Sequence, residues 1–196
     1  MYYPLMLDLS QFRCIVIGGG NVAYRKVKSL LTYGGKVTVI SERFIEALKE
    51  LPIQCIESPF EMAMLEQLRG EALLVIVATS DQACNEGIAL YCRAHHILCN
   101  IATNEALSSF IVPSSMQRGD LVIAVSTGGN SPALAAKIQR ELEEKYSEDF
   151  GNYVQKLGEL RTVIKDKVVD EKQRRQLLRG LLEMDEEALM SYEYKG

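Results

Sequence analysis

The chain has 196 residues, of which 47% are hydrophobic and 24% charged, a globular composition that excludes global disorder. Its length suits one large domain, or one domain of about 140–150 residues with an appendage. Residues 1–140 contain 12 basic and 12 acidic side chains and the rest contain 10 and 14, so the whole net charge of −4 lies in the C-terminal part. This balance excludes the basic surface of a nucleic-acid-binding protein.

The sequence carries no signal for membrane insertion or export. No apolar run reaches the roughly 20 residues that a membrane-spanning helix requires. The N-terminus has no basic residue ahead of its apolar stretch, which Asp8 interrupts, so we expect no signal peptide and a cytoplasmic protein. The five cysteines form no Cys-x-x-Cys pair and are interpreted as small buried residues of a reducing compartment. His95 and His96 are adjacent and point in different directions, so no metal site is predicted.

Short apolar runs alternate with amphipathic segments through the first two thirds of the chain. The run over 72–78 is apolar throughout, as is typical of a central parallel strand. The alternation predicts an α/β fold, a Rossmann-type doubly wound and mostly parallel sheet. Strands are expected over 13–17, 36–40, 53–57, 72–78, 97–102, 110–113 (a short or edge strand) and 121–125, and helices over 22–33, 42–51, 61–69 and 81–95.

From Ser131 onward the pattern is only helical. Ser131 followed by Pro132 predicts a helix start, because the hydroxyl can cap free N–H groups and proline has no N–H to leave unpaired. We expect this helix to end near Lys145 and two further helices over 148–166 and 171–192. A helical tail without a core of its own packs on the sheet domain or on a second subunit, and we favour dimerisation.

Three consecutive glycines follow the first predicted strand. Gly18-Gly-Gly20-Asn-Val-Ala23 fits the G-x-G-x-x-G/A fingerprint inside a βαβ unit. Gly18 permits the tight turn, Gly20 lets the backbone approach a pyrophosphate, and Ala23 lets the helix pack closely on the sheet. The alternative interpretation is a simple strand-to-helix turn. The context favours a dinucleotide site.

Residues after the second and the central predicted strands are candidates for further cofactor contacts. Glu42 follows Gly18 by 24 residues, close to the sequence spacing of about 20 at which an acidic residue binds the ribose hydroxyls in such folds. Its carboxylate would also repel a 2′-phosphate, which favours NAD. Arg43 would do the opposite by accepting that phosphate, and Glu42 could instead begin the next helix. Thr79 is predicted to touch the cofactor. Asp81 is better explained as a helix N-cap.

Several motifs occur in the order and spacing of a known family. These segments are Pro4-Leu-Met-Leu-Asp-Leu9, Gly18-Gly-Gly-Asn-Val-Ala-Tyr-Arg-Lys26, Ala78-Thr-Ser-Asp81 with Asn85, Cys99-Asn100, Phe110-Ile-Val-Pro-Ser114 and Val125-Ser-Thr-Gly-Gly-Asn-Ser-Pro132. Through them residues 4–140 resemble the precorrin-2 dehydrogenases of sirohaem synthesis, and the tail is similar to the helical dimerisation and C-terminal region of that family.

The resemblance implies a homodimeric enzyme that oxidises precorrin-2 to sirohydrochlorin with NAD; some relatives also insert iron into sirohydrochlorin. It implies an NAD-binding domain over 1–112, a dimerisation segment over 113–145 and a helical region over 146–196. It also places nucleotide contacts on Asn21, Val22, Glu42 and Arg43. The full set of expected cofactor contacts is Gly18, Gly20, Asn21, Val22, Ser41, Glu42, Arg43 and Thr79.

A second glycine turn is the candidate for the substrate, which carries many carboxylates. Gly128-Gly-Asn-Ser131 lies at a helix start after the last predicted strand of the sheet, where N–H groups and the helix dipole favour an anion. The alternative is a plain turn and cap. Arg118 and Lys137 are candidate partners of the substrate carboxylates, but we favour their interpretation as solvated surface residues. The expected substrate contacts are Ser126, Thr127, Gly128, Gly129, Asn130 and Ser131.

One position departs from the family. Members commonly have Asn-Val-Val-Asp where this chain has Asn100-Ile-Ala-Thr103, with Asn104 beside it. A carboxylate can accept a proton as hydride leaves, whereas threonine and asparagine cannot act as bases near neutral pH. Thr103 and Asn104 are therefore the candidate catalytic positions of a dehydrogenase in which another group or water takes the proton. The alternatives are a catalytically impaired tetrapyrrole- and NAD-binding protein, or a bifunctional enzyme that also inserts Fe²⁺.

Overall fold

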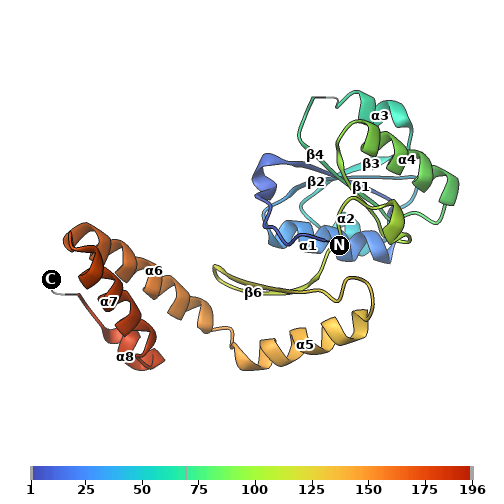
Figure 1. Ribbon diagram of the computed structural model, residues 1–196. Coiled ribbons are helices and arrows are strands. Elements are labelled where there is room, and N and C mark those ends of the chain that lie inside the picture. Colours follow the sequence, from blue (N-terminus) through green and yellow to red (C-terminus); the bar gives the residue numbers. More distant parts are fainter. Residues whose placement is uncertain (1, 69, 195–196) are drawn as a thin grey trace. The chain divides into compact units, whose positions relative to one another are not determined.

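A computed structural model describes residues 2–68 and 70–194 of the chain (Figure 1). The chain divides into two compact units, residues 1–112 and residues 113–196. Each unit has hydrophobic clusters of its own. The two units are therefore described separately.

The first unit is a five-stranded parallel sheet in the order β3-β2-β1-β4-β5. The chain forms β1, β2 and β3 outward in one direction and then crosses back to add β4 and β5 on the other side of β1, which is the doubly wound pattern predicted. The strands are β1 (Arg13–Ile17), β2 (Lys36–Ser41), β3 (Gln54–Glu57), β4 (Leu73–Val77) and β5 (Leu98–Ile101).

Helices cover both faces of this sheet (Figure 1). Side chains alternate along a strand, so Ile15 and Ile17 of β1 face α3 and α4, whereas Cys14 and Val16 face α1 and α2. All five residues of β4 are buried, as the apolar run predicted. The helices are α1 (Asn21–Thr32), α2 (Glu46–Lys49), α3 (Met62–Glu66) and α4 (Gln82–Ala94), with short 3₁₀ turns η1 (Leu9–Gln11) and η2 (Glu105–Leu107).

The second unit begins with an antiparallel hairpin of β6 (Ser114–Arg118) and β7 (Leu121–Val125). The prediction that 121–125 continues the parallel sheet is wrong, and no strand forms over 110–113. Ser114–Arg118 was missed because its polar, unbranched residues carry little intrinsic strand preference. It becomes a strand by pairing with β7 across a turn at Gly119, whose φ of +55° suits glycine.

In the described part of the second unit four helices follow the hairpin: α5 (Pro132–Lys145) packs on the hairpin, and α6 contacts both α7 and α8. The last three are α6 (Phe150–Lys167), α7 (Glu171–Leu182) and α8 (Glu186–Ser191). Two expectations were wrong here. The single helix expected over 171–192 is instead two helices, because α7 ends at Leu182 and Asp185 caps the start of a separate helix, α8. The tail also has a core of its own, formed by Leu160, Ile164, Val168, Leu181 and Leu189.

The cysteines follow their predicted interpretation with one exception. Cys14, Cys92 and Cys99 are buried and Cys84 is partly buried, whereas Cys55 is exposed. Burial raises the pKa of the Cys14 thiol to about 11, so it is neutral at physiological pH and packs as a small hydrophobic group. Within the described ranges, no helix combines the length and the apolar character that crossing a membrane requires.

Candidate functional site

The predicted cofactor residues meet at the carboxyl edge of the parallel sheet. The strand order reverses direction between β1 and β4, and ligands of open parallel sheets bind in the crevice at such a point. The glycine turn follows β1, residues 41–43 follow β2, Thr79 follows β4, and Thr103 follows β5. The fold therefore brings four separate sequence segments to one edge.

The first two glycines of the turn are required by their neighbours. Gly18 has a φ of +117°, and a Cβ there would lie 2.5 Å from the carbonyl oxygen of Ala78. A Cβ on Gly19 would lie 2.0 Å from the carbonyl oxygen of Arg43. The Gly18 N–H donates to the carbonyl of Ile40 at 2.9 Å. The turn is thus fitted between the ends of β2 and β4, and larger residues would push them apart.

Gly20 differs because nothing lies within 4 Å of its Cβ position. Its backbone angles, φ −95° and ψ −170°, suit any residue, so neither strain nor packing explains a glycine here. It is the N-cap of α1 and makes no side-chain cap bond, and Asn21 and Val22 in the first turn are exposed. Open space before the N–H groups of a helix start fits the pyrophosphate of a dinucleotide.

The loop after β2 is fastened to the glycine turn. The Ile45 N–H donates to the carbonyl of Gly19 at 3.0 Å, and the Ser41 hydroxyl donates to the carbonyl of Arg43 at 2.9 Å. Glu42 and Arg43 are both exposed within this loop. The alternative that Glu42 begins the next helix is wrong, because α2 begins at Glu46. The structure therefore places Glu42 and Arg43 beside the turn, whereas Ser41 shapes the loop.

Across β1 from that loop, the ends of β4 and β5 are joined by Asn85, a side chain that is only 3% exposed. Its Oδ1 lies 2.7 Å from the Thr79 hydroxyl, and its Nδ2 lies 3.2 Å from the Thr79 carbonyl and 3.4 Å from the Thr103 hydroxyl. Asn85 belongs to one of the segments shared with the family but was not among the predicted site residues. The available signal was a polar residue on the helix face that also carries Ile88, Ala89 and Cys92.

Two neighbouring residues act as caps. Asp81 accepts from the Cys84 N–H at 3.0 Å and caps α4, as expected. Asn104 accepts from the Ala106 N–H at 3.0 Å and caps η2. The Asn104 side-chain oxygen is therefore engaged in the turn. Of the two predicted catalytic positions, Thr103 is the one that presents an exposed hydroxyl at the sheet edge.

The second glycine turn lies in the second unit, after β7, and so does not follow a strand of the parallel sheet as expected. Gly128 and Gly129 adopt positive φ angles of 60° and 85°. The N–H groups of Gly128, Asn130 and Ser131 donate to Ser126 Oγ, the Thr127 carbonyl and Thr127 Oγ1 respectively. Three of the N–H groups that the sequence predicted to bind a substrate carboxylate therefore already donate to acceptors inside the loop.

Arg118 is not the solvated residue that the sequence suggested. Its side chain is 12% exposed and pairs with Glu148 at 3.2 Å. Its Nε also donates to the carbonyl of Tyr146 at 3.0 Å, which fastens the hairpin to the segment before α6. Lys137 is exposed and pairs with Glu141 at 3.8 Å, as a surface residue does.

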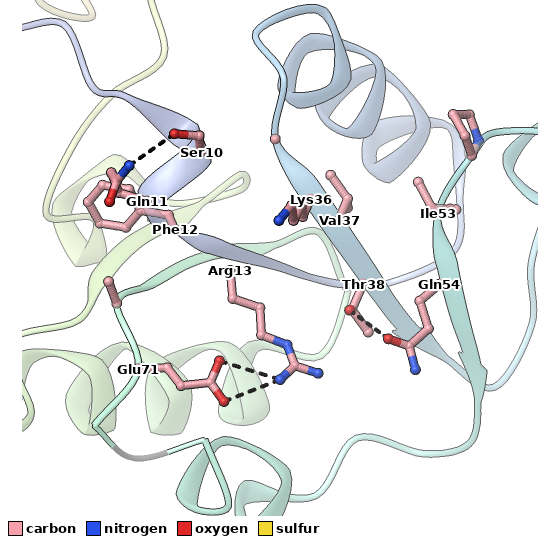
Figure 2. Close-up of a pocket in the computed structure, with 13 residues that line it drawn as sticks. Ser10, Gln11, Phe12, Arg13, Lys36, Val37, Thr38, Ile53, Gln54 and Glu71 are labelled. Carbon is pink, nitrogen blue, oxygen red and sulfur yellow. Dashed lines mark hydrogen bonds and ion pairs between the residues drawn. The ribbon is translucent and has the colours of Figure 1, made fainter.

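A hollow of about 810 Å³ lies at the opposite, amino edge of the sheet (Figure 2). The Arg13–Glu71 ion pair, at 3.3 Å, and the Thr38–Gln54 hydrogen bond, at 3.2 Å, line it. None of the predicted site residues is among its lining residues. It is wide but lacks the glycine turn and helix start that a dinucleotide needs, so the carboxyl edge is the candidate site. Within 2–68 and 70–194, no three His, Cys, Asp or Glu side chains are grouped to hold a metal ion.

Comparisons with known proteins agree with this geometry. An NAD(P)-binding family matches residues 5–114, and the sirohaem biosynthesis protein central family matches residues 118–145. A precorrin-2 dehydrogenase from Methanosarcina barkeri is 34% identical over 94% of this chain and 84% of its own length. A siroheme synthase from Salmonella arizonae is 33% identical over 89% of this chain, which spans only 38% of that protein.

The solved structure of SirC, a precorrin-2 dehydrogenase, superposes with a TM-score of 0.73 at 28% sequence identity. The match covers 97% of this chain and 93% of SirC, so it includes the helical second unit as well as the parallel sheet. The fold, the glycine turn and the extent of both matches lead to one assignment. The chain belongs to the precorrin-2 dehydrogenase and siroheme synthase family.

Proposed function

We propose that this protein oxidises precorrin-2 to sirohydrochlorin with NAD, a step of sirohaem synthesis. The observation that carries the proposal is the glycine turn, fitted between β2 and β4 with open space before α1, in a chain similar to precorrin-2 dehydrogenases over nearly its whole length. When bound, NAD supplies the hydride acceptor. The protein supplies binding and orientation.

The cofactor residues divide into three groups. The backbone of Gly18 and Gly20 and the first turn of α1, with Asn21 and Val22, would hold the pyrophosphate. Glu42 would bind the ribose hydroxyls and repel a 2′-phosphate, which favours NAD over NADP despite Arg43 beside it. The Ser41 hydroxyl supports this loop. Thr79, whose hydroxyl is bonded to Asn85, would line the nicotinamide side.

For the substrate we propose the turn after β7. Its remaining polar groups and the dipole of α5 would receive carboxylates of the tetrapyrrole. The contacts would come from the segment Ser126, Thr127, Gly128, Gly129, Asn130 and Ser131. Because the N–H groups of Gly128, Asn130 and Ser131 are bonded within the loop, the donors would be the Ser126 and Thr127 hydroxyls and the Gly129 N–H. Thr103 and Asn104 stand at the position of the family aspartate, and because neither is a base near neutral pH, the released proton would pass to water or to another group.

We also propose a homodimer in which residues 113–145 dimerise, with 1–112 as the NAD-binding domain and 146–196 as the helical region. The support is that β7, an apolar strand, is only partly buried, and that Leu134 of α5 is 48% exposed. A second copy of the chain would cover these residues. Five free cysteines favour the reducing cytoplasm as its location.

The proposal is tested by anaerobic incubation of the protein with precorrin-2 and NAD. The expected result is a rise in NADH absorbance together with formation of sirohydrochlorin, and a much smaller rise with NADP because Glu42 repels its 2′-phosphate. Heat-denatured protein and reactions without precorrin-2 are the controls. If NAD binds measurably but no NADH forms, the dehydrogenase proposal fails.

That outcome would favour the second candidate, a tetrapyrrole- and NAD-binding protein that has lost catalysis. The specific observation in its favour is Thr103, a hydroxyl where the family commonly has a carboxylate. Turnover of precorrin-2 at a measurable rate would exclude it.

A further inference from the structure

The orientation of the Asn85 amide is fixed by its neighbours. Its side chain is buried between the ends of β4 and β5, and one terminal atom lies 3.2 Å from the Thr79 carbonyl oxygen. A carbonyl oxygen only accepts hydrogen bonds, so the amide NH₂ must face it. The amide oxygen then faces the Thr79 hydroxyl at 2.7 Å, and that hydroxyl must donate.

The hydrogen bonds that link Asp81 to Thr103 through Asn85 consequently form a chain with one direction. The Asp81 N–H donates to Thr79 Oγ1 at 3.2 Å, and Thr79 Oγ1 donates to Asn85 Oδ1. Asn85 Nδ2 in turn donates to Thr103 Oγ1 at 3.4 Å. Since the Thr103 oxygen receives a hydrogen from Asn85, its own hydrogen is free to be donated away from the protein interior. Thr103 is exposed at the sheet edge, so a ligand can reach it.

The position of Thr103 indicates which part of a ligand it meets. β5 is two strands from β1, and with neighbouring strands about 4.8 Å apart its end lies roughly 10 Å from the glycine turn. β2, which leads to Glu42, lies on the other side of β1. A dinucleotide with its pyrophosphate on the turn and its adenosine ribose at Glu42 therefore extends its nicotinamide half over β4 and β5.

We infer that Asn85 is a positioning residue that turns the Thr103 hydroxyl into a hydrogen-bond donor for the nicotinamide half of NAD. The inference rests on the proposed NAD site. An ionised aspartate at position 103 would only accept hydrogen bonds, whereas this threonine donates one to an oxygen of the nicotinamide ribose or carboxamide. Thr103 thus orients the cofactor, and proton acceptance is left to another group.

The first test compares ligand binding by two variants at position 103. Thr103→Val removes the hydroxyl at nearly constant volume, and Thr103→Ser keeps it. Calorimetric titration with NAD is expected to show affinity about three- to tenfold weaker for Thr103→Val and near that of the parent protein for Thr103→Ser, the range of one hydrogen bond. ADP, which has the adenosine and both phosphates but lacks the nicotinamide half, is expected to bind all three equally.

The second test asks whether Asn85 acts through Thr103. In Asn85→Asp an oxygen replaces the NH₂ group beside the Thr79 carbonyl, so the buried acid binds a proton and donates it to that carbonyl. The same oxygen accepts a hydrogen bond from Thr103 and turns the Thr103 hydrogen inward, so NAD binding is expected to weaken by a similar factor. In the Thr103→Val background the same change should add almost nothing, because the hydroxyl is already gone. A general loss of packing would instead weaken ADP binding and would persist in that background.

The outcomes separate this inference from the proposed function, because binding of NAD and ADP requires no precorrin-2. Equal NAD affinity of Thr103→Val and Thr103→Ser overturns the inference, even if the enzyme turns over. The inference is also overturned if Thr103→Val loses affinity for ADP by the same factor as for NAD. The inference is supported if Thr103→Val weakens binding of NAD but not of ADP, even in a protein that does not oxidise precorrin-2. Absence of NAD binding by the parent protein overturns both.

Discussion

The three glycines after β1 have different physical reasons to be glycine. Side chains on Gly18 and Gly19 would collide with backbone carbonyl oxygens at 2.5 and 2.0 Å, so these two residues are required by the fold. Gly20 has ordinary backbone angles and free space around it, so the fold does not require it. The proposed cofactor, whose pyrophosphate would approach the backbone, accounts for a glycine at this position.

This difference gives a prediction at residue scale. Gly20→Ala is expected to change the thermal midpoint little, because the poorer N-cap preference of alanine is offset by the lower entropy of its unfolded chain. It is expected to weaken NAD binding by about tenfold or more, since a methyl group occupies the space of the pyrophosphate. Thermal unfolding and calorimetric titration measure the two effects. Gly19→Ala is the contrasting variant, with a stability loss of about 1–3 kcal/mol from overpacking. Unchanged NAD affinity in a folded Gly20→Ala protein would contradict the proposed cofactor site.

Between elements of the second unit, the β6–β7 turn closely approaches the start of α6. A Cβ on Gly151 would lie 2.9 Å from the Gly119 nitrogen and 3.1 Å from the Arg118 carbonyl carbon. Arg118 supports the same junction through its bonds to Glu148 and Tyr146. Glycine at this point lets a hairpin turn pack directly on a helix.

We therefore expect Gly151→Ala to lower the free energy of unfolding by about 1–3 kcal/mol, because two backbone segments must separate. Gly158→Ala is the matched control in the same helix, where nothing lies within 4 Å of the added Cβ. That substitution is expected to stabilise α6 by about 0.5–1 kcal/mol through helix propensity. Urea unfolding followed by circular dichroism measures both. Equal effects of the two substitutions would show that the close contact is absent in solution.

For the whole molecule, the proposed homodimer predicts how the mass responds to substitution. Leu134→Glu places a charge on the exposed apolar residue of α5 and is expected to shift the mass from dimer toward monomer. The helix should tolerate it, because Leu134 is three residues after the N-cap Ser131, where glutamate is favourable. Light scattering coupled to gel filtration measures the mass.

Val169→Glu is the control for that experiment. Val169 is 94% exposed and lies outside residues 113–145, so its substitution should leave the mass unchanged. A monomeric parent protein would refute the dimer proposal. A dimer that only Val169→Glu disrupts would move the interface to the C-terminal helices.

The sequence by itself determined the first unit and the position of its glycine turn. Short apolar runs, amphipathic segments and the glycine fingerprint are local signals, and they located β1 to β5, α1 and α4, and Gly18–Gly20. The helix start at Ser131 was also predicted, because a cap and a proline are adjacent in sequence.

Only the tertiary structure decided the remaining features. β6 is a polar segment that becomes a strand through its partner, β7 leaves the parallel sheet, and the tail buries a core of its own. Asn85 and Thr103 are 18 residues apart and meet because β4 and β5 end at the same edge. Local propensity cannot encode such contacts, since they depend on strand pairing and on the direction of hydrogen bonds between distant residues.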